Sequence, residues 1–190
     1  EEIINQLYAN NIKITIIFHS VADVTIKGLE SSLSWIKDSL SKVCNILVHN
    51  VEDLNFFKKL NLFNVKFLPH GVSNRINIKP KIQKDITSIS SYGFMLPHKG
   101  IIDLINAFFI VEKEFSDICL VLVNAVYPVK QSKDYLNLCK KRVKELNLSH
   151  KVTFHSDFLS DEKSYELLDK TDLLVMPYHN TNESASGAIR

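Results

Sequence analysis

The chain has 190 residues, of which 45% are apolar. It is therefore long enough for one domain or two small ones and can bury a core, which excludes a disordered chain. Charge is nearly balanced, with 23 basic against 21 acidic residues and a net charge of +2, so a strongly cationic nucleic-acid binder is also excluded. No apolar stretch approaches the roughly 20 residues that span a bilayer.

The three cysteines, Cys44, Cys119 and Cys139, share no spacing typical of a metal site. Cys119 lies in the apolar run ICLVLV, and Cys139 lies in a segment with helical periodicity. We expect both to be small buried side chains of a protein from a reducing compartment.

The first half of the chain alternates short apolar runs with amphipathic segments. The runs at 12–18, 45–49 and 65–68 predict strands. Two helices are predicted between them, with apolar positions at Leu29, Leu33, Ile36, Leu40 and Val43 in the first and at Leu54, Phe57 and Leu60 in the second. Apolar strands separated by helices predict a parallel sheet covered on both faces.

The stretch 73–85 breaks this alternation, because SNRINIKPKIQKD is polar, rich in lysine and contains a proline. We interpret it as a linker between two α/β units, with a long surface loop as the alternative. Strands are then predicted over 86–92, 118–124, 152–155 and 173–177, and helices over 100–115, over 134–147 and around Tyr165 and Leu168. The final residues, ESASGAIR, indicate the opening of a further helix.

Five of the seven histidines lie at or just past the carboxyl end of a predicted strand: His19, His49, His70, His155 and His179. Open parallel sheets bind ligands beyond these ends, so the set predicts a polar crevice. A loop or capping role is the alternative for each histidine alone. A metal site is the weaker interpretation, because no pair has helical ligand spacing and no cysteine joins them.

The segment GFMLPHKG at 93–100 leaves a strand, turns at Pro97 and enters a helix. Its glycines permit a positive φ or a close approach of the backbone to a ligand. Lys99 is then near a helix N-terminus, where its ammonium adds to free N–H groups and the positive end of the helix dipole. This arrangement favours an anion, and a solvent-facing lysine is the alternative.

The end of the chain repeats this pattern, since a polar loop and then ESASGA follow the run LLVMP. Small residues at a helix start allow a diphosphate to approach the backbone amides. Glu183 can accept hydrogen bonds from sugar hydroxyls at that entry, or serve only as a carboxylate favoured by the helix dipole.

Three segments resemble the signature of GT-B glycosyltransferases of the large family 4 type: HGV at 70–72, GFMLPHKGIIDLINAF at 93–108 and LLVMPYHNTNESASGAIR at 173–190. The resemblance implies an α/β protein with two Rossmann-like, doubly wound parallel-sheet domains, both incomplete in this chain. Residues 1–72 would be the C-terminal part of the acceptor-side domain, 73–85 the linker, and 86–190 the nucleotide-sugar-binding domain, truncated at its C-terminus.

The resemblance also implies roles for particular residues. Four positions match those that bind the donor diphosphate: Gly93, Lys99, Ser186 and Gly187. Glu183 matches the first glutamate of the Glu-x7-Glu motif, which contacts the donor sugar. His19 is similar to the acceptor-domain histidine near the reacting centre and would orient or polarise the sugar or acceptor.

Two departures from the family pattern are visible. The family usually has an arginine one residue after the first glycine, where this chain has Phe94, so one phosphate-neutralising charge is missing or comes from elsewhere. Loss of one such electrostatic contact typically costs roughly 3 kcal/mol of barrier. The second glutamate of the motif would fall one residue beyond Arg190. By resemblance the chain is the middle of a longer enzyme, and a fragment can fold yet be inactive.

The implied reaction is retaining transfer of a hexosyl group from a nucleotide diphosphate sugar to a glycan, lipid or protein acceptor, as in polysaccharide biosynthesis. The sequence has no D-x-D motif, so we expect no metal and no cofactor apart from the donor substrate. Two alternatives are a nucleotide-sugar epimerase and a non-catalytic GT-B-like binding or partner module. We expect no nucleic-acid partner and a cytoplasmic location, with peripheral association at the inner face of a membrane allowed through the acceptor domain.

Overall fold

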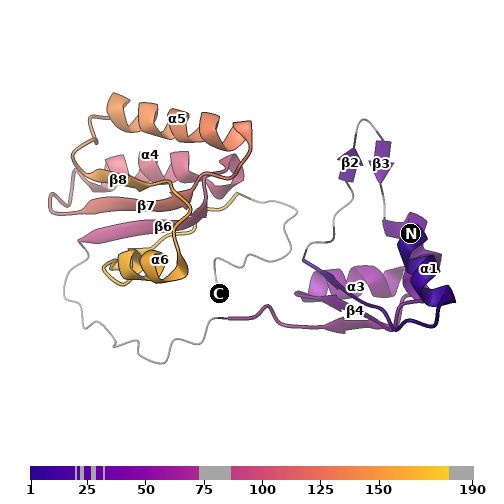
Figure 1. Ribbon diagram of the computed structural model, residues 1–190. Helices are drawn as coiled ribbons and strands as arrows, with labels where there is room; N and C mark the ends of the chain where they lie inside the picture. The colour runs from indigo at the N-terminus through magenta and orange to yellow at the C-terminus, as the bar shows by residue number, and fades with distance from the viewer. Residues whose placement is uncertain (20, 22–23, 27–28, 32, 73–86, 180–190) are drawn as a thin grey trace. The chain divides into compact units, whose positions relative to one another are not determined.

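The computed structural model describes residues 1–19, 21, 24–26, 29–31, 33–72 and 87–179 (Figure 1). These residues divide between two compact units, 1–72 and 87–179. The predicted linker at 73–85 lies outside the described residues.

The first unit contains a three-stranded parallel sheet in the order β1-β4-β5. Its elements in chain order are α1 (Glu2–Ala9), β1 (Thr15–Phe18), β2 (Val24–Ile26), β3 (Leu29–Ser31), the 3₁₀ helix η1 (Leu33–Ile36), α2 (Lys37–Ser41), β4 (Asn45–Val48), α3 (Val51–Lys59) and β5 (Val65–Phe67). Phe18 pairs with Val48, and Val48 pairs with Phe67. The three strands therefore end level with one another at the carboxyl edge.

Apolar side chains of β4 build the core of this unit. Ile46 and Val48 are fully buried together with Phe57 of α3 and Leu40 of α2. Ile17 of β1, which points to the other face of the sheet, is 48% exposed. Within this unit the described residues cover mainly one face of the sheet, whereas the sequence predicted cover on both faces.

The expectation of one helix from residue 29 to residue 43 is wrong. Leu29–Ser31 is the strand β3, which pairs antiparallel with β2, and helical structure begins only at Leu33. Val24–Ile26 is rich in β-branched residues, which favour a strand, and this preference prevails over the apolar spacing. The helix α1 was not predicted at all.

The second unit contains a four-stranded parallel sheet in the order β8-β7-β6-β9. Its elements are β6 (Ser88–Phe94), the 3₁₀ helix η2 (Pro97–Lys99), α4 (Ile101–Val111), β7 (Cys119–Ala125), α5 (Lys130–Glu145), β8 (Val152–His155), α6 (Asp161–Leu168) and β9 (Leu173–Leu174). Each strand predicted in this unit is present; β8 has the predicted bounds, and the ends of the other three strands are shifted. The α/β class with two parallel sheets is thus confirmed.

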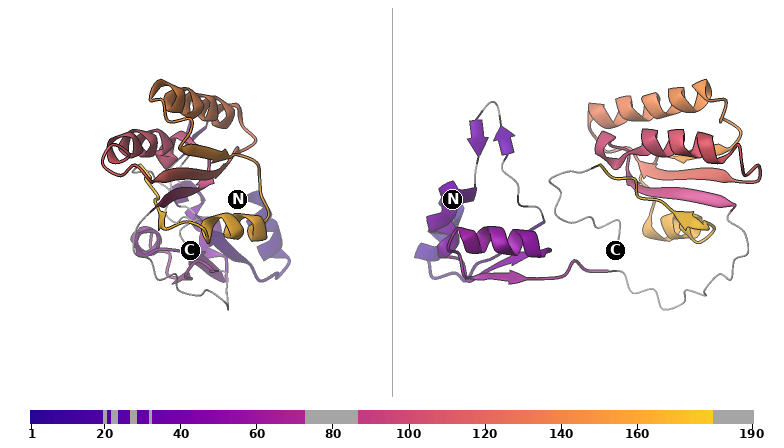
Figure 2. Two further views of the ribbon diagram at one scale, coloured as in Figure 1. Left: turned by 90° about the vertical axis from the view of Figure 1, so that its left-hand side faces the viewer. Right: turned by 180° about the vertical axis from the view of Figure 1, so that it is seen from behind.

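The strand order places helices on both faces of this sheet. Crossover connections between parallel strands are right-handed, so α4 and α5, which lead outward from β6 to β8, share one face. The connection from β8 back to β9 runs in the opposite direction, and α6 lies on the opposite side of the strands from α4 and α5 (Figures 1 and 2). This unit is therefore doubly wound.

The core of this unit lies between β7 and the helix pair α4–α5. Ile101, Ile105 and Phe108 of α4 and Cys139 and Val143 of α5 are buried, as the helical spacing predicts. Cys119 is only half-buried, less than predicted.

None of the described helices combines the length and the apolar character that a membrane crossing requires.

Candidate functional site

The reversal of strand order in the second unit lies between β6 and β9. The chain leaves β6 toward the face that carries α4, and it reaches β9 from the face that carries α6. In open α/β sheets such a reversal, beyond the carboxyl ends of the strands, is the place where ligands bind. The segment after β6 is Met95–Gly100, and the segment after β9 is Val175–His179.

These two segments meet backbone to backbone. The N–H of His179 donates a hydrogen bond to the carbonyl of His98 over 2.9 Å. Gly100 has φ +67°, and a Cβ atom there would collide with the carbonyl of Pro177. Gly93, near the end of β6, also has a positive φ, +130°. Both glycines are therefore required by backbone geometry.

Lys99 is held at this crossing. The residue is only 8% exposed, and Nζ lies 4.2 Å from the centroid of the Tyr178 ring. A ring face attracts an ammonium group, so Tyr178 stabilises the charge of Lys99 at the entrance of α4. The sequence predicted the position of Lys99 but not the role of Tyr178, whose only signal is its place directly after the strand predicted over 173–177.

A second polar pair lies at the same crossing. Nε2 of His179 is within hydrogen-bond distance of Oδ2 of Asp103, which belongs to the first turn of α4. This pair is exposed on both sides. It ties the loop after β9 to the start of α4, beside Lys99.

Phe94, where the family usually has an arginine, lies in an aromatic group. Its ring centroid is 5.0 Å from that of Tyr127 and 6.3 Å from that of Phe158, and the Phe158 side chain is 81% exposed. The end of β6 therefore presents aromatic rings where the family pattern has a cation.

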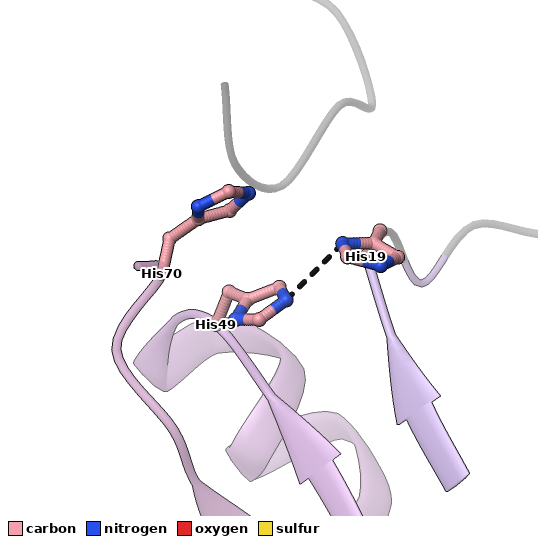
Figure 3. A group of neighbouring side chains, drawn as sticks. All are labelled: His19, His49 and His70. Atoms are coloured by element: carbon pink, nitrogen blue, oxygen red, sulfur yellow. Dashed lines mark hydrogen bonds between the residues drawn. The ribbon is translucent and has the colours of Figure 1, made fainter. Parts of the chain in front are cut away.

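The first unit gathers three of the predicted histidines at the carboxyl edge of its sheet (Figure 3). His19 follows β1, His49 follows β4 and His70 follows β5. The ring centroid of His49 lies 5.0 Å from that of His19 and 4.8 Å from that of His70. Nε2 of His49 and Nδ1 of His19 are 3.2 Å apart.

The structure divides the predicted histidine set between the two units. His155 and His179 belong to the second unit, where His155 is the last residue of β8 and His179 lies in the segment that follows β9. Glu183, Ser186 and Gly187 lie outside the described residues.

Two parallel α/β sheets, with a lysine at the reversal of strand order in the second, agree with the GT-B type that the sequence resembles. Residues 73–187 match the family described as Glycosyl transferases group 1. The chain belongs to this family.

Solved structures of the same fold match most of the chain. Sucrose-phosphate synthase from Thermosynechococcus elongatus gives a TM-score of 0.68 at 18% identity, over 91% of this chain and 46% of its own. A mutant of S. aureus TarM, in complex with fondaparinux, α-GlcNAc-glycerol and UDP, gives a TM-score of 0.63 at 18% identity. The match covers 86% of this chain and 32% of the TarM chain. Alr3699/HepE of Anabaena, in complex with UDP and glucose, gives a TM-score of 0.59 at 11% identity. The match covers 90% of this chain and 48% of the HepE chain.

The chain thus spans about a third to a half of the length of these solved proteins. A comparison with curated protein sequences gives no match.

Proposed function

We propose that this chain carries the donor site of a retaining glycosyltransferase that moves a hexosyl group from a nucleotide diphosphate sugar to a glycan, lipid or protein acceptor. The family match over 73–187 supports the class of reaction. The observation that carries the donor assignment is the buried Lys99 at the reversal between β6 and β9.

In this proposal the donor diphosphate binds at the entrance of α4. The ammonium of Lys99 and the positive end of the α4 dipole would stabilise the charge that grows on the leaving diphosphate. Gly93 lets the chain turn before Lys99. Ser186 and Gly187 would add backbone amides, and Glu183 would hold the sugar hydroxyls.

The remaining assignments concern the first unit and the partners. We propose 1–72 as part of the acceptor-side domain, 73–85 as the linker and 86–190 as the donor-side domain. His19 would orient or polarise the acceptor or the sugar, without acting as a general base. The protein would be cytoplasmic or peripheral to the inner face of a membrane, with no metal for the diphosphate and no nucleic-acid partner.

The test is calorimetric titration of the 190-residue chain with UDP, GDP and ADP, on the unaltered chain and on Lys99→Met. Methionine keeps the apolar stem over Tyr178 and removes the charge. A hydrogen bond to a charged group contributes about 1.5–3 kcal/mol, so we expect binding of one diphosphate to weaken about 10- to 100-fold in Lys99→Met.

Lys113→Met is the matched control. Lys113 is exposed, and its Nζ lies 4.0 Å from the centroid of the Phe109 ring, so the same kind of cation–ring contact is lost away from the crossing. Its diphosphate affinity should equal that of the unaltered chain. Equal weakening in both variants, or the absence of binding by folded chain, would contradict the donor assignment.

One observation favours a second candidate, a binding module without catalysis. Phe94 and its aromatic neighbours stand where the family has a phosphate-neutralising arginine. This candidate predicts that a nucleotide sugar binds but is neither transferred nor hydrolysed. Chromatography of the incubated mixture would then show only the intact nucleotide sugar.

A further inference from the structure

The topology of the first unit brings three imidazole rings to one place. The strands β1, β4 and β5 are neighbours in one parallel sheet and end level with one another. Each is followed by a histidine, at once for His19 and His49, whereas two residues separate His70 from the end of β5. We propose that His19, His49 and His70 bind a Zn²⁺ ion through one ring nitrogen each.

The hydrogen bonds of His49 fix which of its nitrogens can bind a metal. Nδ1 of His49 lies 2.9 Å from the carbonyl oxygen of Leu68. A carbonyl can only accept, so Nδ1 carries the proton and Nε2 carries the lone pair. A backbone carbonyl that holds the second ring nitrogen of a histidine is the usual outer partner of a metal ligand. His49 is 6% exposed, so packing also fixes its ring.

His70 has the same arrangement. Its Nδ1 lies 3.1 Å from the carbonyl oxygen of Gly71, so this nitrogen is the donor and Nε2 bears the lone pair. His70 and His49 thus both direct an unprotonated Nε2 away from a backbone carbonyl. This shared tautomer is the one that a metal ion requires.

The distances suit a small divalent ion. The three ligand atoms lie within 4.8 Å of one another. Tetrahedral zinc with bonds of about 2.0–2.1 Å holds its nitrogen ligands about 3.3–3.4 Å apart. Here Nδ1–H of His19 donates a hydrogen bond to Nε2 of His49 over 3.2 Å, a separation that matches this value. The ion would replace this hydrogen bond, with His19 then carrying its proton on Nε2. His19 is exposed and His70 is half-buried, so a modest rotation of these side chains can bring Nε2 of His70 within bonding distance of the same ion.

The donor set selects the metal. Three neutral imidazoles suit Zn²⁺, Cu²⁺, Ni²⁺ and Co²⁺, whereas Mg²⁺ and Ca²⁺ prefer oxygen ligands. Three protein ligands leave the fourth tetrahedral position for water or for an oxygen atom of a bound molecule. The site lies within the first unit alone, so it does not rest on the proposed donor site. It revises the expectation that these histidines bind no metal, and it replaces the direct role of His19 toward the acceptor or the sugar.

The test is calorimetric titration of the untagged, metal-free 190-residue chain with ZnCl₂, followed by the visible spectrum of the Co²⁺ complex. We expect one ion per chain and the intense visible absorption of four-coordinate cobalt. Loss of an outer partner of a metal ligand costs about 10- to 100-fold in affinity, so loss of a direct ligand should cost at least about 100-fold. His19→Gln, His49→Gln and His70→Gln should each show this loss.

Two variants serve as controls. His150→Gln removes an exposed histidine of the second unit, and Cys44→Ser removes an exposed thiol that precedes β4, at the opposite edge of the sheet. Both should bind Zn²⁺ as the unaltered chain does. Because His49 is buried, circular dichroism must show its variant folded, and the exposed His19 supplies an independent measurement. Binding that survives in His19→Gln or His70→Gln, or no binding by the unaltered chain, would overturn the proposal.

Discussion

The carbonyl oxygen of Pro177 occupies the space that a Cβ atom on Gly100 would take. The strands β6 and β9 are far apart in the sequence, yet the loops that follow them touch at this point. Lys99 and Tyr178 are the next residues on either side. The contact therefore sets the position of the lysine that we assign to the diphosphate.

Gly100→Ala should destabilise the second unit strongly. The substitution places a side chain at φ +67° and forces the two backbones apart. We expect the free energy of unfolding to fall by about 3 kcal/mol, measured by urea denaturation. Gly71→Ala is the control, since a Cβ on Gly71 meets no atom within 4 Å, and it should change stability by less than about 0.5 kcal/mol. Equal losses of stability in the two variants would contradict the close contact between Gly100 and the carbonyl of Pro177.

Asp172 should stabilise the junction between β9 and β6. Its Oδ2 accepts hydrogen bonds from the N–H groups of Thr87 and Ser88, over 3.0 and 2.9 Å, and from the hydroxyl of Thr87 over 2.9 Å. Asp172→Ala should lower the free energy of unfolding by about 1–3 kcal/mol. Asp117→Ala, which removes an acceptor of one exposed hydroxyl, should have an effect within about 0.5 kcal/mol. The same urea experiment measures both.

Cys139 should resist thiol reagents in the folded chain. Burial between α4 and α5 raises the pKa of its thiol to about 12, and only the thiolate reacts. We expect a maleimide to label the exposed Cys44 rapidly and Cys139 only after denaturant is added. Cys44→Ser should remove the rapid phase, and mass spectrometry of peptides identifies each labelled site. Rapid labelling of Cys139 in the folded chain would contradict the burial of its thiol.

The buried thiol also has a consequence for stability at high pH. The unfolded chain releases the proton of Cys139 near the usual thiol pKa, whereas the folded chain retains it. Stability should therefore fall as the pH rises above that usual value. Cys139→Ala would remove this contribution.

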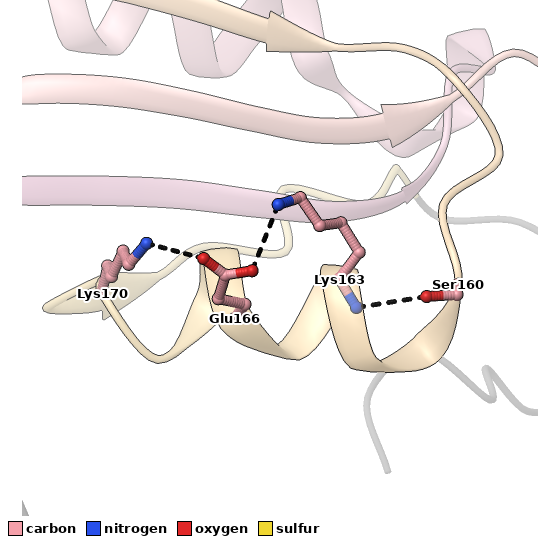
Figure 4. A network of polar contacts seen from close by, with 4 residues as sticks. All are labelled: Ser160, Lys163, Glu166 and Lys170. Atoms are coloured by element: carbon pink, nitrogen blue, oxygen red, sulfur yellow. Dashed lines mark hydrogen bonds and ion pairs between the residues drawn. The ribbon is translucent and has the colours of Figure 1, made fainter.

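Glu166 of α6 should titrate at low pH. Its carboxylate contacts Lys170 over 3.0 Å and Lys163 over 3.2 Å, in a helix that begins at the Ser160 cap (Figure 4). The hydrogen bond from Lys170, and then that from Lys163, lower the pKa of this carboxyl. The pairs therefore stabilise the fold above the usual glutamate pKa, and this stabilisation is lost as the pH falls through the lowered one.

NMR titration of the Glu166 carboxyl measures this shift. Lys170→Met should raise the Glu166 pKa toward its usual value more than Lys163→Met does. Because the pairs are exposed, neither variant should change the melting temperature at neutral pH appreciably. An unaltered Glu166 pKa in both variants would contradict the contacts.

The sequence predicted the parallel strands well, because short runs of isoleucine and valine have few other interpretations in an alternating pattern. It also placed His19, His49 and His70 at strand ends. The absence of ligand spacing along one helix argued against a metal site, whereas these three histidines converge through three neighbouring strands. Pairing order in a sheet is a long-range property that local periodicity does not contain.

The site in the second unit was only half predictable for a similar reason. Lys99 follows from a glycine turn before a helix, which is local information. Its burial against Tyr178 depends on the pairing of β6 with β9. The error over residues 29–43 has the opposite cause, since local spacing fitted a helix and the antiparallel pairing of β2 with β3 prevailed.

The strand order of the second unit also determines when its sheet can be completed. Ser88 and Asp172 lie 84 residues apart in the sequence but are joined by hydrogen bonds. During synthesis on the ribosome, β7 and β8 can pair early, while one edge of β6 stays open until β9 has emerged. An open strand edge is a template for other chains, and closure over so long a span is slow. The nascent unit is therefore most prone to aggregation just before β9 pairs with β6.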